Sequence, residues 1–226
     1  MNVNLSNSDL TTLTATNYET INLKSSLGEG SGSVTNTVTT LINQIASTLV
    51  ITGDTDLTIT NALAQGSINA ATFTGILTAT GSAAADTLNG GTNNDKLTGG
   101  GGVDTFTGNA GDDTFMTLTA SGNDRDTTVD ALTDVIKDFT NGLNTLGGLG
   151  TKANATNYFE ETTSVINLTN LLAAAETKLD GTVKYYLDSV GSDTYLVVDD
   201  NGTGYTDVIK LMGTTLDNID TSSIIA

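Results

Sequence analysis

A repeat of nine residues in the middle of the chain constrains the fold more than any other feature of this 226-residue sequence. Every unit opens with glycine, at Gly81, Gly90, Gly99 and Gly108. The sixth position is always aspartate and the eighth is always apolar: Asp86, Asp95, Asp104 and Asp113, then Leu88, Leu97, Phe106 and Phe115. Six turn-forming residues followed by three residues with a central apolar side chain predict a turn and a very short strand. Two units would close one coil.

The coil predicts a metal site between its stacked turns. Turns on one edge pair Asp86 with Asp104 and Asp95 with Asp113. Because glycine allows positive φ, turn carbonyls can point inward and complete a cage of oxygen ligands, which Ca²⁺ prefers. The turn residues expected to contribute are Gly90, Thr92, Gly100, Gly102 and Gly111. Since paired carboxylates repel, we expect folding of the coil to require calcium.

Some units depart from the glycine pattern. Ala83–Ala85 replace glycine in the first unit, and Asn93 and Asn109 replace it in the second and fourth. Asparagine tolerates the left-handed conformation, so we expect the first turn to be the most altered. A solvated linker and a phosphate-binding loop at Gly99–Gly102 are alternatives. The loop lacks the Lys and Ser/Thr pair of a phosphate site, and Asp104 would repel phosphate.

Composition excludes whole classes of function. The formal charge of −18, from 26 acids and 8 bases, disfavours nucleic acids and anionic bilayers as partners. Without His or Cys there is no Ser-His-Asp triad, thiol nucleophile, disulfide or ordinary zinc site. We expect no enzymatic activity; an acid-only glycosidase stays open, although only Glu160 and Glu161 form a carboxylate pair among the glutamates. The 44 threonines and the absence of proline favour an all-β chain.

The chain divides into three regions by pattern. Residues 1–80 hold short apolar strands in a Thr/Asn-rich background and predict solenoid-like coils or a sandwich. Residues 81–139 form the repeat-bearing roll, and residues 140–226 a β-rich cap with strands near 183–187, 194–198 and 207–211. Apolar residues at helical spacing predict a helix over 168–179 and a second, short helix over 37–49.

The repeats resemble those of RTX proteins, which Gram-negative bacteria secrete by type I export. Residues 134–139 are similar to the segment that closes such rolls, and Asp193–Gly213 and the Thr/Asn-rich coils are similar to parts of RTX surface-layer proteins. The resemblance implies a parallel β-roll or β-solenoid with calcium-binding turns and minor short helices. It also implies Asp134 and Asp138 as further calcium ligands, and export information in the C-terminal region.

The resemblance also implies a function and a location. We expect a structural surface-layer (S-layer) module on the cell surface of a Gram-negative bacterium, which folds and self-assembles into a lattice on binding calcium. Its partners would be other copies of itself, the type I secretion machinery and a cell-surface glycan held through regions outside this chain. The alternative is the folding and export module of an RTX hydrolase, toxin or adhesin.

Targeting signals are absent from the sequence pattern. The first ten residues lack a basic patch followed by an apolar run, so we expect no secretory signal peptide. No stretch of 18 apolar residues occurs, so we also expect no membrane span.

A second oxygen-rich cluster lies in the C-terminal region. Asp199, Asn201, Thr203 and Asp207 occupy positions 1, 3, 5 and 9 of a loop. Lys210 stands where an EF-hand needs glutamate, so that motif is excluded. A calcium site and a simple turn between strands both stay open. A further acidic cluster, whose members are Asp124, Asp126 and Asp130, is either a solvated insertion or another partial calcium cage.

Overall fold

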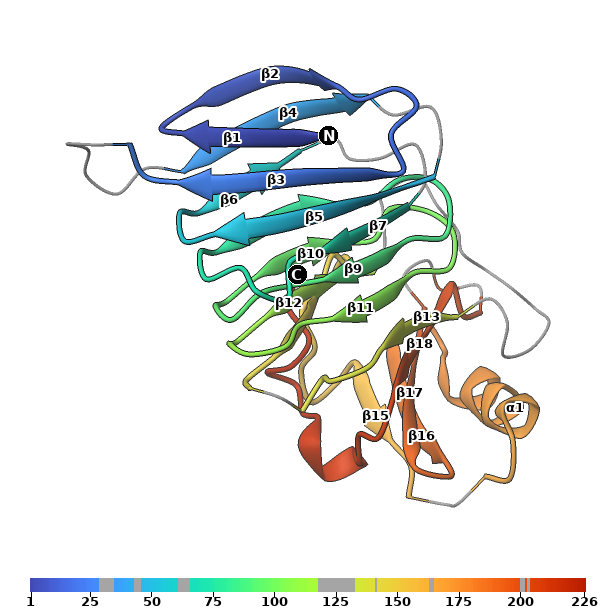
Figure 1. Ribbon diagram of the computed structural model, residues 1–226. Coiled ribbons are helices and arrows are strands. Elements are labelled where there is room, and N and C mark those ends of the chain that lie inside the picture. The colour runs from blue at the N-terminus through green and yellow to red at the C-terminus, as the bar shows by residue number, and fades with distance from the viewer. Residues whose placement is uncertain are drawn as a thin grey trace.

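Two parallel sheets face each other and form a solenoid, shown in Figure 1 with its first coils in blue. The computed structural model describes residues 1–28, 35–42, 46–60, 66–117, 133–140, 142–162, 165–199, 202 and 204–226. Among these residues the chain alternates between the sheets, so that consecutive odd-numbered strands pair with one another and even-numbered strands do the same. The prediction of an all-β parallel β-roll or β-solenoid is confirmed.

Sheet A holds the odd-numbered strands of the solenoid. They are β1 (Asn2–Ser6), β3 (Thr20–Ser26), β5 (Ser47–Gly53), β7 (Gly66–Asn69), β9 (Thr87–Asn89), β11 (Thr105–Thr107) and β13 (Asp134–Ile136). Sheet B holds the even-numbered ones. They are β2 (Asp9–Thr14), β4 (Asn36–Ile42), β6 (Leu57–Ile59), β8 (Leu77–Thr80), β10 (Lys96–Thr98), β12 (Thr114–Met116) and β14 (Thr145–Gly147).

The strands of the repeat have the predicted length of three residues, and their central side chains fill the space between the sheets. In sheet A, Leu88 is in register with Ile68 on one side and with Phe106 on the other. The ring of Phe106 meets that of Phe115 from sheet B edge-on, with centroids 5.9 Å apart. All four side chains are at most 1% exposed, and burial of each contributes about 1.5–3 kcal/mol.

The helix predicted over 37–49 is wrong. Residues 36–42 form β4 and residues 47–53 form β5, which belong to different sheets. Val38 and Leu41 both face the core, so their three-residue spacing mimics a helical stripe. Strand β4 is rich in β-branched residues, with Thr37–Thr40 and Ile42, and such residues favour strands once neighbouring coils offer pairing partners.

The C-terminal residues close the far end of the solenoid. They form β15 (Tyr158–Glu160), α1 (Leu168–Lys178), β16 (Tyr185–Val190), β17 (Asp193–Val198), β18 (Asp207–Leu211) and the 3₁₀ turn η1 (Leu216–Asn218). Strand β18 pairs in parallel with β13 and so extends sheet A, while β16 and β17 continue it antiparallel. No helix in the described part of the chain has the length and apolar character needed to cross a membrane.

The predicted C-terminal helix is present as α1. Asn167 caps it by accepting a hydrogen bond from the Asn170 N–H at 2.9 Å. Leu168, Leu171 and Ala175 form its buried face against sheet A. Tyr186 is also fully buried in this cluster, which identifies it as a packing residue.

The sheets continue without a break from the first region into the second. Strand β7 pairs with β9 and β8 pairs with β10 across residue 80. The described strands form one continuous stack across the first predicted boundary, at 80/81. That boundary and the second one, at 139/140, stay predictions.

Candidate metal centre

The aspartates of the repeat form two columns, one on each edge of the roll. In the first column, Asp86 donates its backbone N–H to Asp104 Oδ1 at 2.9 Å, and Asp104 donates to Asp134 Oδ1 at 2.7 Å. In the second column, Asp95 donates its N–H to Asp113 Oδ1 at 2.8 Å. All five side chains are at most 4% exposed. The structure therefore places the predicted pairs in successive coils and adds Asp134 to the first column.

The glycine that opens each unit makes room for the aspartate of the same unit. A Cβ on Gly99 would lie 2.0 Å from Asp104 Oδ2, and one on Gly108 would lie 2.1 Å from Asp113 Oδ2. Gly90, a predicted site residue, shows the same approach to its own aspartate at 2.4 Å. No side chain fits in these positions, since real Cβ contacts do not fall below about 3 Å. Gly99 and Gly108 were not among the predicted site residues, although the repeat itself singles out their position.

The four turns adopt two conformations. In the third and fourth turns the second and fourth positions have positive φ; these residues are Gly100, Gly102, Asn109 and Gly111, with φ of 112°, 89°, 70° and 118°. The first two turns, over 82–85 and 91–94, contain no residue with positive φ. The altered first turn was expected from its alanines. The second turn was expected to be less altered than the first, but the two turns share this feature, since Asn93 does not adopt the left-handed conformation.

The turn conformation decides what each carboxylate contacts. In the first two turns the second-position N–H of Ser82 or Gly91 donates to the Oδ2 atom of Asp86 or Asp95. In the fourth turn, Asp113 Oδ2 is buried and accepts no hydrogen bond from the described residues. Its oxygen is therefore the one that a cation would satisfy.

Burial makes these carboxylates costly to ionise without a cation. Burial raises the pKa of Asp113 to about 7, with further contributions from the charges of Asp95, Asp138 and Asp112. Burial likewise raises the pKa of Asp95 to about 6, opposed by hydrogen bonds from the Gly91 and Leu77 N–H groups. A bound divalent cation would supply the positive charge that this column lacks.

The donor set fits calcium. Among the described residues no three acidic side chains gather around one point, so a site here takes its remaining oxygens from turn carbonyls. Thr92 donates both its N–H and its hydroxyl to Phe73 O, at 3.0 and 3.4 Å, and so its hydroxyl is used within the solenoid. The aspartate pairs and the turns of Gly100, Gly102 and Gly111 would hold the ion. That ligand set stays a prediction.

Asp138 has a structural task that the sequence did not indicate. Its Oδ1 accepts the Gly108 N–H at 2.9 Å and its Oδ2 accepts the Asn109 N–H at 2.8 Å. The carboxylate thus holds the start of the fourth turn from the next coil. Whether Asp138 also binds calcium stays a prediction.

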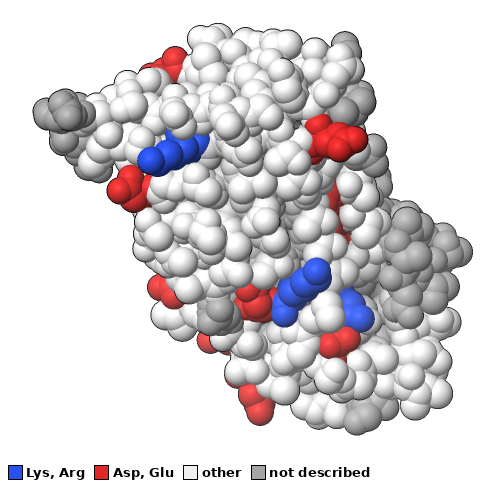
Figure 2. Space-filling model, in the orientation of Figure 1, with Lys and Arg blue, Asp and Glu red and all other residues white. Residues whose placement is uncertain are grey.

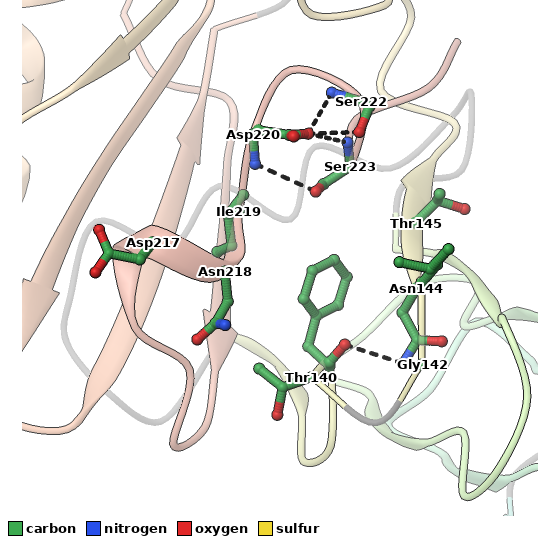
Figure 3. Close-up of a pocket in the computed structure, with 12 residues that line it drawn as sticks. Thr140, Gly142, Asn144, Thr145, Asp217, Asn218, Ile219, Asp220, Ser222 and Ser223 are labelled. Atoms are coloured by element: carbon green, nitrogen blue, oxygen red, sulfur yellow. Dashed lines mark hydrogen bonds between the residues drawn. The ribbon is translucent and has the colours of Figure 1, made fainter.

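Asn144 ends the second aspartate column and was also missed. Its Oδ1 accepts the Asp113 N–H at 2.6 Å, and its Nδ2 donates to Phe139 O at 3.0 Å. The run from Asn144 to Gly147 is Asn-Thr-Leu-Gly, which copies the Asp-Thr-Leu-Asn of the first unit and could have revealed it. Asn144 also lines a cavity of about 380 Å³. Figure 3 shows it beside Thr140 and opposite the C-terminal segment that holds Asp217, Asn218 and Asp220.

The C-terminal cluster is only partly described. Asp199 is fully buried at the end of β17 and accepts the Gly202 N–H at 2.6 Å. Asp207 opens β18, and its Oδ1 accepts the Val208 N–H at 2.7 Å. Asn201 lies outside the described residues, as do Thr203 and the cluster of Asp124, Asp126 and Asp130. The two interpretations of this hairpin, calcium site or turn, both stay open.

Comparison with known proteins supports this geometry. The family described as RTX calcium-binding nonapeptide repeat matches residues 80–115 and accounts for four copies. These residues are therefore RTX repeats, which bind calcium, and they indicate a secreted protein of the RTX type. A search of curated proteins returned no match.

Proposed function

We propose that this chain is a non-enzymatic structural module of a surface-layer protein. It leaves a Gram-negative cell by type I export, folds when calcium binds the repeats and assembles with other copies into a two-dimensional lattice. The anchor to a cell-surface glycan would lie in regions outside this chain. The observation that carries the proposal is the unbroken stack of coils from β1 to β14, which joins the Thr/Asn-rich coils to the RTX roll.

A continuous solenoid suits a structural role. Stacked coils form a rod of fixed geometry, because each strand between the two end coils is hydrogen-bonded to a strand of the coil before it and a strand of the coil after it. Calcium then needs to bind only the RTX roll, which is one part of the rod. The complete rod forms where calcium is present. Outside the cell, calcium supplies the external stabilisation that disulfides provide in other secreted proteins.

Charge makes assembly depend on calcium as well. The face in Figure 2 carries scattered acidic and basic side chains, and the whole chain has a formal charge of −18. Each bound Ca²⁺ removes two negative charges, and ions between molecules would link carboxylates directly. Assembly should thus need more calcium than folding does, and NaCl alone should not reproduce it.

A calcium series tests the proposal. Light scattering and negative-stain microscopy of the whole chain should show ordered sheets that appear only at calcium concentrations above those that fold the roll. Magnesium and NaCl at matched ionic strength are the controls. A chain that is folded at about 1 mM calcium and stays free of sheets at about 10 mM would contradict the lattice.

The second candidate function is the folding and export module of an RTX hydrolase, toxin or adhesin. It is favoured by the closed C-terminal end, where β18 and the segment around Ile224 extend both sheets. Such a module would fold with calcium but form no sheets, so the same series separates the two functions.

A further inference from the structure

The fourth turn departs from the hydrogen-bond pattern of the units before it. In the first three units, the N–H of the opening glycine donates to a backbone carbonyl of the next coil. These bonds run from Gly81 to Thr98 O at 2.7 Å, from Gly90 to Thr107 O at 2.9 Å and from Gly99 to Met116 O at 3.0 Å. In the fourth unit, the Gly108 N–H donates to Asp138 Oδ1 at 2.9 Å. A side chain of the next coil therefore takes the place of a backbone carbonyl.

The same side chain changes the partner of the second position in the turn. In the first two units, the N–H at this position donates to the Oδ2 atom of the aspartate of the same unit. The two bonds run from Ser82 to Asp86 and from Gly91 to Asp95. In the fourth unit, the Asn109 N–H donates to Asp138 Oδ2 at 2.8 Å. Because Asp138 accepts this N–H, Asp113 Oδ2 stays buried without a hydrogen bond from the described residues.

The backbone of Asn109 shows why the fourth turn benefits from being held. Its φ of 70° lies in the left-handed region, which asparagine adopts less readily than glycine. The third turn has glycine at the same position, where Gly100 has a φ of 112°. The Asn109 side chain also donates to Gly90 O of the coil before, at 2.8 Å. Neighbouring coils therefore fix Asn109 from both sides, through Gly90 and through Asp138.

Asp138 also adds negative charge beside the fourth turn. Burial raises the pKa of Asp113, and the nearby charges of Asp138 and Asp112 raise it further. A negative charge near a cation site attracts the ion whether or not the group binds it directly. Asp112 is exposed, and its Oδ1 atom accepts the Leu143 N–H at 2.9 Å, which an asparagine could do equally well. The substitution Asp112→Asn therefore isolates the effect of charge.

We propose that Asp138 positions the fourth turn for calcium and is not itself a ligand of the ion. Its two carboxylate oxygens hold the N–H groups of Gly108 and Asn109, which fixes the left-handed turn and leaves Asp113 Oδ2 to the cation. This role differs from the one predicted from the sequence, which is that of a ligand. It concerns calcium binding by the repeats alone, and so it does not depend on the surface-layer lattice.

A double-mutant cycle on the whole chain separates positioning from ligation. Asp138→Asn leaves one acceptor oxygen for two N–H groups, so the Asn109 N–H can turn to Asp113 Oδ2. The calcium midpoint in calorimetric titration should then rise about tenfold. The charge control Asp112→Asn should raise it about threefold or less. Asn109→Gly gives the fourth turn the glycine pattern of the third. In that background, Asp138→Asn should raise the midpoint only about threefold, since glycine adopts positive φ unaided.

Hydrogen exchange adds a readout that does not depend on affinity. In the calcium-loaded chain, the Asn109 amide should exchange faster in Asp138→Asn than in the wild type, while the Asp95 amide, which donates to Asp113 Oδ1, stays protected. An equal loss of affinity in both backgrounds would identify Asp138 as a ligand and overturn the proposal. A loss no larger than that of the charge control, or an unchanged Asn109 amide, would also overturn it.

The double variant keeps the test decisive if Asp138→Asn does not fold. Circular dichroism across a calcium series then compares the single variant with Asp138→Asn, Asn109→Gly. Recovery of calcium-dependent folding in the double variant supports positioning, because the substituted turn no longer needs the carboxylate to adopt its conformation. Failure of the double variant to recover contradicts positioning.

Discussion

The first coils and the RTX coils share one solenoid geometry, but equivalent positions at the edges of the sheets hold different types of residue in the two regions. On the sheet B edge, Leu57 is in register with Leu77, and the Leu77 N–H donates to Asp95 Oδ1 at 2.7 Å. Asp113 follows in the next coil. A column of buried leucines thus becomes a column of buried carboxylates. On the sheet A edge, Gly66 occupies the corresponding place and donates its N–H to Asp86 Oδ1 at 2.9 Å.

The difference shows what calcium is needed for. Strands β3 and β5 have seven residues each, while those of the repeats have three, so each RTX coil has fewer ladder hydrogen bonds and a smaller core. Apolar burial stabilises the first coils directly. The RTX coils add desolvated carboxylates to a thinner core, and we therefore expect their folded state to depend on the cation.

Removing calcium should have the largest effect and should separate the two regions. With a chelator, we expect strands β9–β14 to lose amide protection while β3–β6 retain much of theirs, because only the former stack around buried carboxylates. Hydrogen exchange resolved by region measures this, with circular dichroism as a global check.

Magnesium is the control for that experiment. It should restore the protection poorly, since it prefers a small octahedron and keeps its waters. Equal protection of β9–β14 with and without calcium would mean that the RTX coils are held by their core, as the first coils are.

A polar residue in the RTX core should have the next largest effect. Phe106→Asn or Leu97→Asn removes a fully buried apolar side chain and leaves an amide without partners, at a cost of about 3–5 kcal/mol. We expect the roll to stay unfolded at any accessible calcium level, as measured by circular dichroism across a calcium series. Thr105→Asn, which changes the neighbouring outward-facing position, is the control. Recovery of Phe106→Asn at high calcium would show a larger stability margin than the thin core indicates.

Single aspartate substitutions should have smaller, graded effects. Asp113→Ala should raise the calcium midpoint about tenfold or more, because its Oδ2 atom lacks a hydrogen-bond donor among the described residues. Asp95→Ala should have less effect, and Asp86→Ala the least, since their Oδ2 atoms already accept N–H groups of their own turns. Calorimetric titration gives the order. An equal or reversed order would show that the two turn conformations bind calcium alike.

The repeat period predicted the RTX coils in detail. Spacing alone paired Asp95 with Asp113 and placed Leu97 in the core, because a nine-residue period leaves few ways to close a coil. It could not show that Asp138 would hold the fourth turn, since that contact joins residues 29 and 30 apart outside the period.

The first coils were harder to predict. Their coil length varies, so nothing in the sequence marks Leu57 and Leu77 as members of one column, and Val38 and Leu41 suggested a helix. The register there is set by pairing between coils, which local sequence does not contain. The two turn conformations were also missed, although the fourth position of the unit differs between them: it is glycine in the third and fourth turns, and Ala84 or Asn93 in the first two.

Low pH should partly replace calcium in stabilising the RTX coils, and we expect this to be the smallest of the effects. Burial raises the pKa of Asp95 to about 6 and that of Asp113 to about 7, from 3.8, so the folded metal-free roll binds protons that the unfolded chain has released. Its free energy of unfolding should therefore be highest below about pH 4 with respect to these groups and should fall as pH rises to about 7. Urea unfolding in calcium-depleted buffers measures the slope. The double variant Asp95→Asn, Asp113→Asn keeps the surface acids and should lose most of the slope; an unchanged slope would assign it to the general negative charge of the chain instead.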